Sequence, residues 1–389
     1  METDSDNKAS KVKKRDDFND STKSKNWESK KEKKLRKQQK FLEQVDKKRK
    51  SDQNQECEDN LKKKARLNSQ SFEEDGKNLE KNKDKESVSN TAPGKGRPYT
   101  VSIAVAGSII DNAQTPPLKA YLAGQVARAA AIFCVDEVII YDDTGGHGTM
   151  GCEQMARILQ FLECPQYLRK LLFPIHPDLQ YAGLTAPLDI PHHLRRTEAL
   201  PYREGVVSSK PRKDGGKDYS LVNVGLDRDC RVSKKLKKGV RVTVKFEDAS
   251  PDYILKSKGK LKGTVVSPHL PRREDGLYWG YTVRIASCLS KVFSECPFQE
   301  GYDVTVGTSE KGSDSRLLKP QRYNHLLVVF GGVEGLEYAL ENDESVEEDD
   351  VSKLFQQYVN TCPSQGSRTI RTEEAILISL NALSHFMHK

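Results

Sequence analysis

The sequence predicts an α/β protein that carries an inserted OB-like β-barrel and a disordered N-terminal tail. A rhythm of strand, helix, strand and helix begins at Tyr99, which is typical of a parallel sheet covered by helices. Between about Arg195 and Ala286 this rhythm gives way to short alternating segments without a helix-length pattern. The predicted divisions are a tail over 1–97, an α/β domain over 98–194 and 287–389, and the barrel over 195–286.

The N-terminal tail has too few apolar residues to fold alone. Residues 1–98 contain 17 hydrophobic residues, against 28 Lys and Arg and 20 Asp and Glu. Burial of so little apolar surface cannot offset the entropy lost on ordering the chain. Two basic clusters, at 23–50 and at Lys62–Arg66, are typical of a nuclear localisation signal, and they suit contacts with phosphates or a solubilising role equally well. We therefore expect a protein of the nucleus, with the nucleolus as a candidate location.

The α/β domain is predicted from buried-strand patterns that end in polar or glycine-rich turns. The β-branched runs YTVSIAVAG and VDEVIIYDD are each followed by a helical pattern, the first of them rich in Ala. The same alternation resumes after the barrel, and the chain closes with an amphipathic helix. The expected strands are 99–107, 135–143, 302–312 and 325–336, and the expected helices before the last one are 118–133, 150–163, 335–342 and 351–359.

The predicted barrel is distinguished by its charge as well as by its strands. Residues 195–291 contain 23 Lys and Arg against 11 Asp and Glu, whereas the chain after residue 98 has 36 of each. Such a concentration of positive charge indicates a module that holds a polyanion, although a solvated basic surface has the same composition. The five expected strands are 202–209, 219–227, 239–247, 261–269 and 278–286.

Cysteine, histidine and hydrophobic patterns exclude several classes of protein. The eight cysteines include no CxxC pair, so neither a disulfide framework nor a zinc ribbon is expected. His147, His192 and His193 lack partners at ligand spacing, so no metal site is predicted. No window approaches the roughly 18 apolar residues of a membrane span, and the N-terminus lacks the apolar core of a secretion signal. We expect a soluble intracellular protein without a membrane partner.

Two glycine-bearing loops follow the later strands of the α/β domain. Gly307, Thr308 and Ser309 end one strand, and the GGVEG segment at 331–335 ends the next. Glycines at strand ends allow the backbone to approach a small molecule and to present its N–H and C=O groups. The spacing matches neither GxGxxG nor GxxxxGK[ST], which excludes both nucleotide-phosphate signatures. A tight turn explains each glycine equally well when it is taken alone.

A third segment gives these loops a more specific interpretation. The sequence FGGVEG at 330–335 is followed by RTIRTEEA at 368–375, and together they resemble the cofactor site of SPOUT-class RNA methyltransferases. The opening VSIAVAGSIIDNAQTPPLKAYLAGQVARAAAIFCVDEVIIYDD and the predicted barrel indicate a particular family within this class. The chain is similar, over roughly 98–389, to the eukaryotic and archaeal SPOUT domain-containing methyltransferases with an OB-like insertion.

The resemblance implies a fold and an activity. The fold is an α/β domain whose last loop and helix are tucked through a trefoil knot. The activity is methyl transfer from S-adenosylmethionine to RNA such as ribosomal RNA, with N3 of uridine as the favoured atom, by a homodimer whose interface completes each active site. Two alternatives remain: a non-catalytic RNA-binding factor of ribosome assembly, and a scaffold whose charged tail recruits proteins. Methyl transfer from a labelled donor separates the enzyme from the RNA-binding factor, and full activity after deletion of residues 1–97 would exclude the scaffold.

The resemblance also implies roles for individual residues. Methylation of an imide nitrogen requires loss of its proton, and a nearby cation stabilises the developing anion. Arg284 and Arg371 are the candidate cations, and Asn112 and Gln114 are candidates to hydrogen-bond a base edge. A surface or loop-tying role is the alternative for each of them. The expected donor-binding residues are Thr308, Ser309, Gly331, Gly332, Gly335, Gln365, Gly366, Thr369 and Ile370.

Several neighbouring residues have two interpretations. Thr372, followed by two glutamates, is typical of a helix N-cap as well as of a cofactor loop. Glu334 either ties a loop amide or meets the substrate. Tyr278, Trp279 and Tyr281 lie close together in one expected strand, where alternate side chains face the core or stack on bases.

Overall fold

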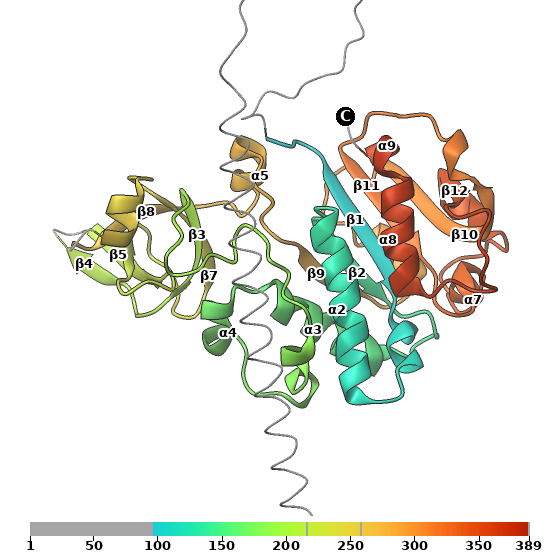
Figure 1. The fold of residues 1–389 in the computed structure, drawn as a ribbon, viewed down its shortest axis with the longest axis horizontal. Helices are drawn as coiled ribbons and strands as arrows, with labels where there is room; N and C mark the ends of the chain where they lie inside the picture. Colours follow the sequence, from blue (N-terminus) through green and yellow to red (C-terminus); the bar gives the residue numbers. More distant parts are fainter. Residues whose placement is uncertain (1–95, 215–216, 257–258, 388–389) are drawn as a thin grey trace, which may run out of the picture. The chain divides into compact units, whose positions relative to one another are not determined.

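The computed structural model describes residues 96–214, 217–256 and 259–387 (Figure 1). The predicted tail over 1–97, with its basic clusters, lies outside these residues except for its last two positions. Among the helices of the described residues, none is long and apolar enough to cross a membrane.

Six strands of the described chain form one parallel sheet (Figure 1). They are β1 (Thr100–Ala106), β2 (Glu137–Tyr141), β9 (Thr282–Ala286), β10 (Val304–Asp314), β11 (His325–Phe330) and β12 (Gln357–Asn360). Their order is β12-β10-β11-β1-β2-β9. Nearly every side chain of β1, β2 and β11 is buried, and strands covered on both faces have the continuous apolar sequence that these three show. The four strands predicted for this domain are confirmed.

The helices pack around this sheet and against one another. They are α2 (Pro116–Ile132), α3 (Thr149–Glu163), α4 (Gln166–Leu172), α5 (Leu270–Asp275), α6 (Leu289–Ser294), α7 (Gly335–Glu341), α8 (Thr372–Ala382) and α9 (Ser384–Met387). Helix α2 begins with two prolines, which suit the first turn of a helix, and its buried face is rich in Ala. Small side chains allow close approach, and α2 contacts both α3 and α8, the latter lying beside it in Figure 1.

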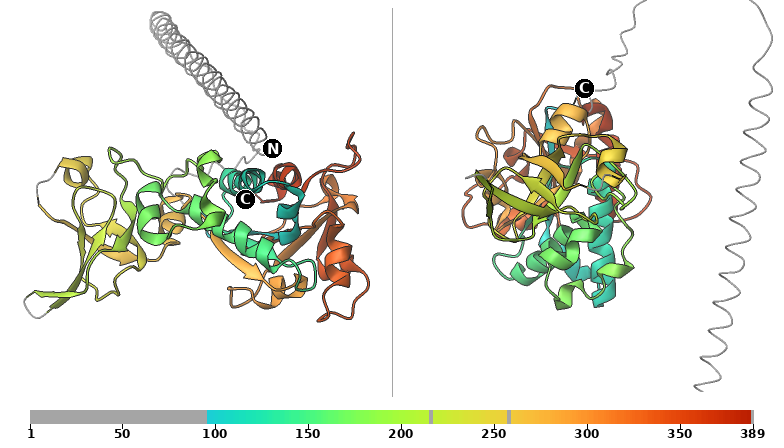
Figure 2. Two further views of the ribbon diagram at one scale, coloured as in Figure 1. Left: turned by 90° about the horizontal axis from the view of Figure 1, so that it is seen from below. Right: turned by 90° about the vertical axis from the view of Figure 1, so that its left-hand side faces the viewer.

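A second set of strands forms the barrel (Figure 2). These strands are β3 (Tyr202–Val207), β4 (Arg212–Asp214), β5 (Lys217–Asn223), β6 (Cys230–Val232), β7 (Arg241–Phe246) and β8 (Leu261–Val266). In the described residues they are hydrogen-bonded in the order β3-β7-β8-β6-β5, and pairing of β3 with β5 closes the ring of five. Strand β4 extends β5 as a hairpin outside the ring. The interior is apolar, with Val222, Val244 and Leu261 fully buried.

The prediction that 278–286 forms the fifth barrel strand is wrong. Its second half is β9, which pairs in parallel with β2 and forms an edge of the other sheet. The barrel is completed instead by β6, whose three residues are too few to show a pattern in the sequence. An edge strand of a parallel sheet is half-exposed, so its alternation resembles that of a barrel strand.

The prediction of a helix over 351–359 is also wrong. Residues Val351–Leu354 form a single 3-10 turn, which starts where the carboxylate of Asp350 accepts a hydrogen bond from the backbone N–H of Ser352. The next residues form β12, an edge strand that pairs with β10. The neighbouring prediction, a helix at 335–342, is confirmed as α7.

Candidate active site

The carboxyl ends of β11, β10 and β12 lie next to one another at one end of the parallel sheet. Loops follow two of these strands, Gly331–Gly335 after β11 and 361–371 after β12, whereas Thr308 and Ser309 lie within β10, where its pairing with β12 shifts in register. Ligands of open α/β sheets bind at this end of the strands. The loops line a cavity of about 270 Å³, which we call the loop cavity.

The loop cavity brings together eight of the nine residues expected to bind a donor. Gly366 is the exception, because it is exposed in the third loop and does not line the cavity. The eight lining residues are Thr308, Ser309, Gly331, Gly332, Gly335, Gln365, Thr369 and Ile370.

The turn after β11 requires its glycines. Gly335 has φ +83°, in the left-handed region, and its N–H donates to the carbonyl of Gly332 at 3.3 Å. A Cβ on Gly332 would lie 2.6 Å from a carboxylate oxygen of Asp143, and a Cβ on Gly331 would lie 2.7 Å from the backbone of Gly335. A side chain at either position would therefore force the loop to move.

Two hydroxyl contacts tie the third loop and α8 to their neighbours. Thr372 donates from Oγ1 to the carbonyl of Gly331 at 2.9 Å, which joins α8 to the glycine turn. The hydroxyls of Thr361 and Ser379 lie 2.7 Å apart. Thr372 is the first residue of α8 and not its N-cap. The N-cap position is occupied by Arg371, whose backbone N–H donates to the carboxylate of Glu374 at 3.1 Å. The hydroxyl predicted to cap the helix instead fixes the cavity wall.

The polar groups of the loop cavity are mainly neutral. Thr308 donates from its hydroxyl to the carbonyl of Val329, and Gln365 donates to carbonyls within its own loop. Lys311 and Glu337 form an ion pair of 2.8 Å. Partial burial would raise the pKa of Glu337, but the hydrogen bond and charge of Lys311, together with hydrogen bonds from the backbone and Tyr358, outweigh this and lower it. Glu334 is exposed, and its carboxylate makes no hydrogen bond within the described residues, so it does not tie the loop.

Sequence reasoning missed several residues of this cavity. The additional lining residues are Glu310, Lys311, Phe330, Val333, Leu336, Glu337, Asn360, Thr361, Cys362, Ala375 and Ser379. A signal was present in the last helix, where Thr372, Ala375 and Ser379 share one face at spacings of three and four and are all small.

The two candidate cations have different surroundings. Arg371 is exposed between two lining residues, and its guanidinium makes no hydrogen bond or ion pair within the described residues. Arg284 lies on β9, which β2, β1 and β11 separate from β10. Its guanidinium donates to Glu137 at 3.1 Å and to two backbone carbonyls of α6, and the side chain is only 19% exposed. Arg371 itself does not line the loop cavity, although its chain neighbours Ile370 and Thr372 do, and Arg284 is held in a structural ion pair.

The turn after β1 approaches the glycine loop from the other side. Asn112 and Gln114 are exposed there, free to meet a ligand. Ser108 donates from its hydroxyl and its backbone N–H to the buried carboxylate of Asp143, at 2.5 and 3.2 Å. Burial raises the pKa of Asp143 despite these hydrogen bonds. The carboxylate of Asp143 also lies against Gly332, so the hydrogen-bonded pair of Ser108 and Asp143 packs against the glycine turn and supports it.

Four of the aromatic and histidine residues noted in the sequence make structural contacts. Tyr278 and Tyr281 are buried and donate their hydroxyls to backbone carbonyls at 2.8 and 3.0 Å, which confirms the core alternative for them. His192 and His193 both contact the carbonyl of Glu163. Within the described residues, no group of three or more His, Cys, Asp or Glu is placed to hold a metal ion.

Comparison with known proteins gives relatives over most of the chain. A family model described as "Putative RNA methyltransferase" matches residues 100–383. A mouse protein named 28S rRNA (uridine-N(3))-methyltransferase is 56% identical over 302 residues, which cover 74% of this chain and 77% of that protein. A human protein of the same name is 52% identical over 325 residues, with coverage of 80% and 84%. A Drosophila melanogaster protein of the same name is 52% identical over 314 residues, with coverage of 75% and 63%.

Proposed function

This chain belongs to a family of RNA methyltransferases, and we propose that it transfers the methyl group of S-adenosylmethionine to N3 of a uridine in 28S ribosomal RNA. The observation that carries the proposal is the loop cavity, where two loops and the middle of β10 bring together eight residues expected to bind the donor. The acceptor is inferred from the names of the mouse and human relatives, which share more than half of their aligned residues with this chain.

The lining of the loop cavity suits S-adenosylmethionine. Backbone groups of the glycine turn and of the third loop, together with hydroxyls such as those of Thr308 and Thr361, would hold polar parts of the molecule without a net charge. Phe330 and Leu336 would contact its apolar surface. Glu334, which no cation of the described residues neutralises, would favour a positively charged ligand. Bound S-adenosylmethionine would supply an electrophilic methyl group on a sulfonium.

The residues around the cavity can orient the acceptor and stabilise its charge. A uridine loses its N3 proton during methylation, and the resulting negative charge is shared with the neighbouring carbonyl oxygens. We assign the stabilising cation to Arg371, because its guanidinium is free and lies beside the cavity, whereas that of Arg284 is fully engaged. Asn112 would hydrogen-bond an edge of the base. Holding the base and donor in line would supply much of the rate.

We extend the proposal to the SPOUT class, to its trefoil knot and to a homodimer. Helix α8 follows the edge strand β12 but packs on β11 and α2, so the chain returns across β10 after β12. In a trefoil knot, this segment between β12 and α8 would be the part of the chain that passes through the knot. Exposed apolar side chains lie on the same helices, with Leu118 and Tyr121 on α2 more than half exposed and Leu377 on α8 37% exposed. A second copy of the chain covering α2 and α8 would bury them.

We also propose that the protein resides in the nucleus and reaches the nucleolus. The support is the pair of basic clusters at 23–50 and Lys62–Arg66 together with the ribosomal RNA substrate of its relatives. A fluorescent fusion that lacks residues 1–97 should spread into the cytoplasm, whereas the full chain should concentrate in the nucleus. Equal distribution of the two would remove the tail from this role.

The activity itself is tested with a labelled donor. The full chain is incubated with S-adenosylmethionine labelled in its methyl group and with large-subunit ribosomal RNA from cells that lack the protein, and the RNA is digested to nucleosides. We expect the label in 3-methyluridine. Label in another nucleoside would refute the assignment to N3, and absence of label with a folded, donor-binding protein would favour the non-catalytic RNA-binding alternative.

A further inference from the structure

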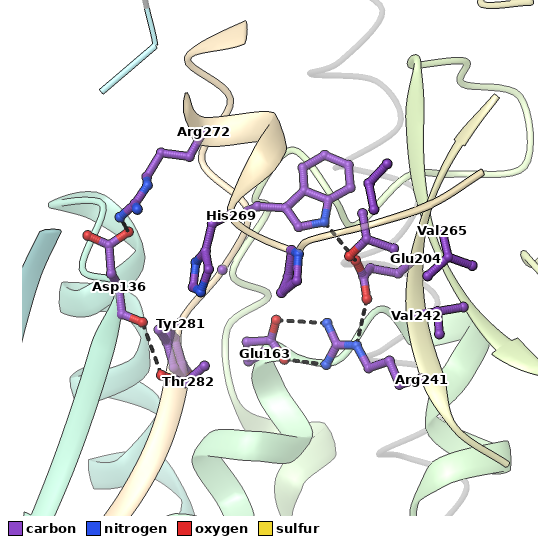
Figure 3. A pocket seen from close by; sticks show the side chains of 15 residues that line it. Asp136, Glu163, Glu204, Arg241, Val242, Val265, His269, Arg272, Tyr281 and Thr282 are labelled. Carbon is purple, nitrogen blue, oxygen red and sulfur yellow. Dashed lines mark hydrogen bonds and ion pairs between the residues drawn. The ribbon is translucent and has the colours of Figure 1, made fainter. Parts of the chain in front are cut away.

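A second cavity, of about 330 Å³, lies where the barrel meets the α/β part of the chain (Figure 3). Strands β7 and β8 of the barrel form one wall, and the end of α3 with the segment 279–282 forms the other. The mouth is beside the exposed residues Pro268 and His269. We call this space the junction cavity; none of its lining residues belongs to the loop cavity.

The carboxylates that line the junction cavity are already neutralised. Arg241 donates two hydrogen bonds to Glu163, at 2.7 and 3.0 Å, and a third to Glu204 at 2.8 Å (Figure 3). Asp136 accepts hydrogen bonds from Arg97 and Arg272 at 2.8 and 2.7 Å. The three guanidiniums of Arg97, Arg241 and Arg272 balance the three carboxylates in number, so these groups give the cavity no net charge that would attract a phosphate or a metal ion. An uncharged ligand suits it better.

Arg272, which lines this cavity and also another cavity of about 180 Å³, has one unsatisfied buried donor. Arg272 is only 7% exposed, and its Nε–H has no hydrogen-bond partner within the described residues, although its terminal nitrogen binds Asp136. A buried donor without a partner costs about 1–3 kcal/mol. A carbonyl oxygen on a ligand would remove this cost, so the site favours a molecule that carries one.

The remaining surface of the junction cavity is apolar and partly flat. Val242, Val266 and Pro268 supply aliphatic surface, Trp279 supplies an indole whose N–H is held by Glu204 at 2.7 Å, and the ring of His269 stands at the mouth. The ring nitrogens of His269 make no hydrogen bond within the described residues, so the ring is free to stack or to bond a ligand edge. A planar heterocycle with a carbonyl group fits these surroundings.

We infer that the junction cavity receives an unpaired nucleobase of the RNA substrate, one with a ring carbonyl such as uracil or guanine, and thereby anchors the RNA between the barrel and the methyltransferase domain. The inference rests on the proposed function, which supplies the RNA. Proteins that recognise RNA commonly take single-stranded bases out of the stack, place them against aromatic or histidine rings and hydrogen-bond their edges. The positive charge of 195–291 would hold the adjoining backbone.

A cavity-filling substitution tests the inference against a matched control. Val266 is half-buried and lines the cavity, whereas Thr264, two residues earlier on the same face of β8, is exposed and does not. In binding to a 28S rRNA transcript at fixed salt, we expect Val266→Trp to weaken affinity by about 5- to 150-fold, the range for one stacked base, and Thr264→Trp to change it less than twofold. Affinity for S-adenosylhomocysteine should stay unchanged in both.

The histidine at the mouth separates stacking from a general loss of structure. His269→Ala should weaken RNA binding, and His269→Phe, which keeps a flat ring, should restore most of it. Equal weakening by both variants, or by neither, would contradict a stacked base at this position.

Crosslinking of the unaltered protein gives a result that does not depend on folding of a variant. RNA substituted with 4-thiouridine is bound, irradiated and digested, and crosslinked peptides are mapped. We expect crosslinks at His269 or Trp279. If the wild-type protein methylates RNA but its crosslinks lie elsewhere and Val266→Trp binds normally, the junction cavity is not a base site and the proposed function stands. If the wild-type protein neither binds nor methylates RNA, the proposed function itself fails.

Discussion

Arg371 and Arg284 show how a single contact decides the role of a residue. Both are arginines in motifs that the sequence marks as interesting, yet the guanidinium of Arg284 is committed to Glu137 and to α6, and that of Arg371 is free beside the loop cavity. Burial alone would lower the pKa of Arg284, and its bonds to Glu137 and Tyr302 raise it. The sequence alone could not distinguish the roles of the two arginines, because it does not show which carboxylate lies next to each guanidinium in the folded chain.

Removal of the Arg371 guanidinium should therefore affect chemistry and spare binding of the donor. For Arg371→Ala we expect the rate of RNA methylation to fall about 100- to 1000-fold, as for loss of one donor to a developing anion. The affinity for S-adenosylhomocysteine should stay within twofold, measured by calorimetry. A folded Arg371→Ala protein that methylates at the wild-type rate would exclude this residue from catalysis.

Removal of the Arg284 guanidinium should affect stability. Arg284→Ala leaves the buried carboxylate of Glu137 with fewer partners, and we expect the free energy of unfolding to fall by roughly 1–3 kcal/mol in urea titrations. At a temperature where the variant is folded, its methylation rate should be close to that of the wild type. Unchanged stability together with a large loss of the RNA methylation rate would show that Arg284 acts in catalysis and not in a structural ion pair.

At the scale of elements, the join between α3 and the barrel strand β7 is an ion pair with a predictable pH response. Burial alone would raise the pKa of Glu163, but Arg241 and His192 outweigh it and lower the pKa to about 2, below the ordinary 4.5. A depressed carboxyl pKa stabilises the folded state fully above the ordinary value, and this contribution is lost as the pH falls from about 4.5 towards 2.

Urea unfolding measured from about pH 5 to about pH 2 checks this response. We expect the wild-type protein to lose more stability over that range than Glu163→Gln, which has no proton to gain at this site. Parallel losses in the two proteins would show that the pair between Glu163 and Arg241 does not form.

The elements that were predictable from sequence are those whose burial is uniform. β1, β2 and β11 are buried on both faces and show as apolar runs, and the basic composition of 195–291 marked the barrel. β6, β9 and β12 were missed or misplaced because each is short or lies at an edge, where the partner strand and not the local pattern decides pairing.

The candidate site was predictable to a similar degree. Eight residues of the loop cavity were named from the sequence because the glycine turn and the third loop resemble known motifs. The small residues Ala375 and Ser379 were missed because their role arises only when α8 returns to pack on β11. The junction cavity had no sequence signal at all, since its walls come from segments separated by more than a hundred residues.

At the scale of the whole molecule, the proposed homodimer would cover apolar side chains that one copy of the chain leaves exposed. Tyr121 on α2 and Leu377 on α8 are exposed on helices that pack together, and their burial in a homodimer would offset the ordering cost of association. In light scattering we expect the wild type to have twice the mass of the chain and the variant Tyr121→Arg/Leu377→Arg to be a monomer with low activity. A wild-type monomer that methylates RNA would exclude the homodimer.

We propose that the loops after β11 and β12, together with Thr308 and Ser309 of β10, form one donor site. Calorimetric titration of the full chain with S-adenosylhomocysteine tests it most directly. We expect saturable binding by the wild type, equal binding by Glu341→Trp on the exposed surface of α7, and at least a tenfold loss in Ala375→Trp, whose indole would fill the loop cavity. Unchanged binding by Ala375→Trp, or none by the folded wild type, would contradict the account.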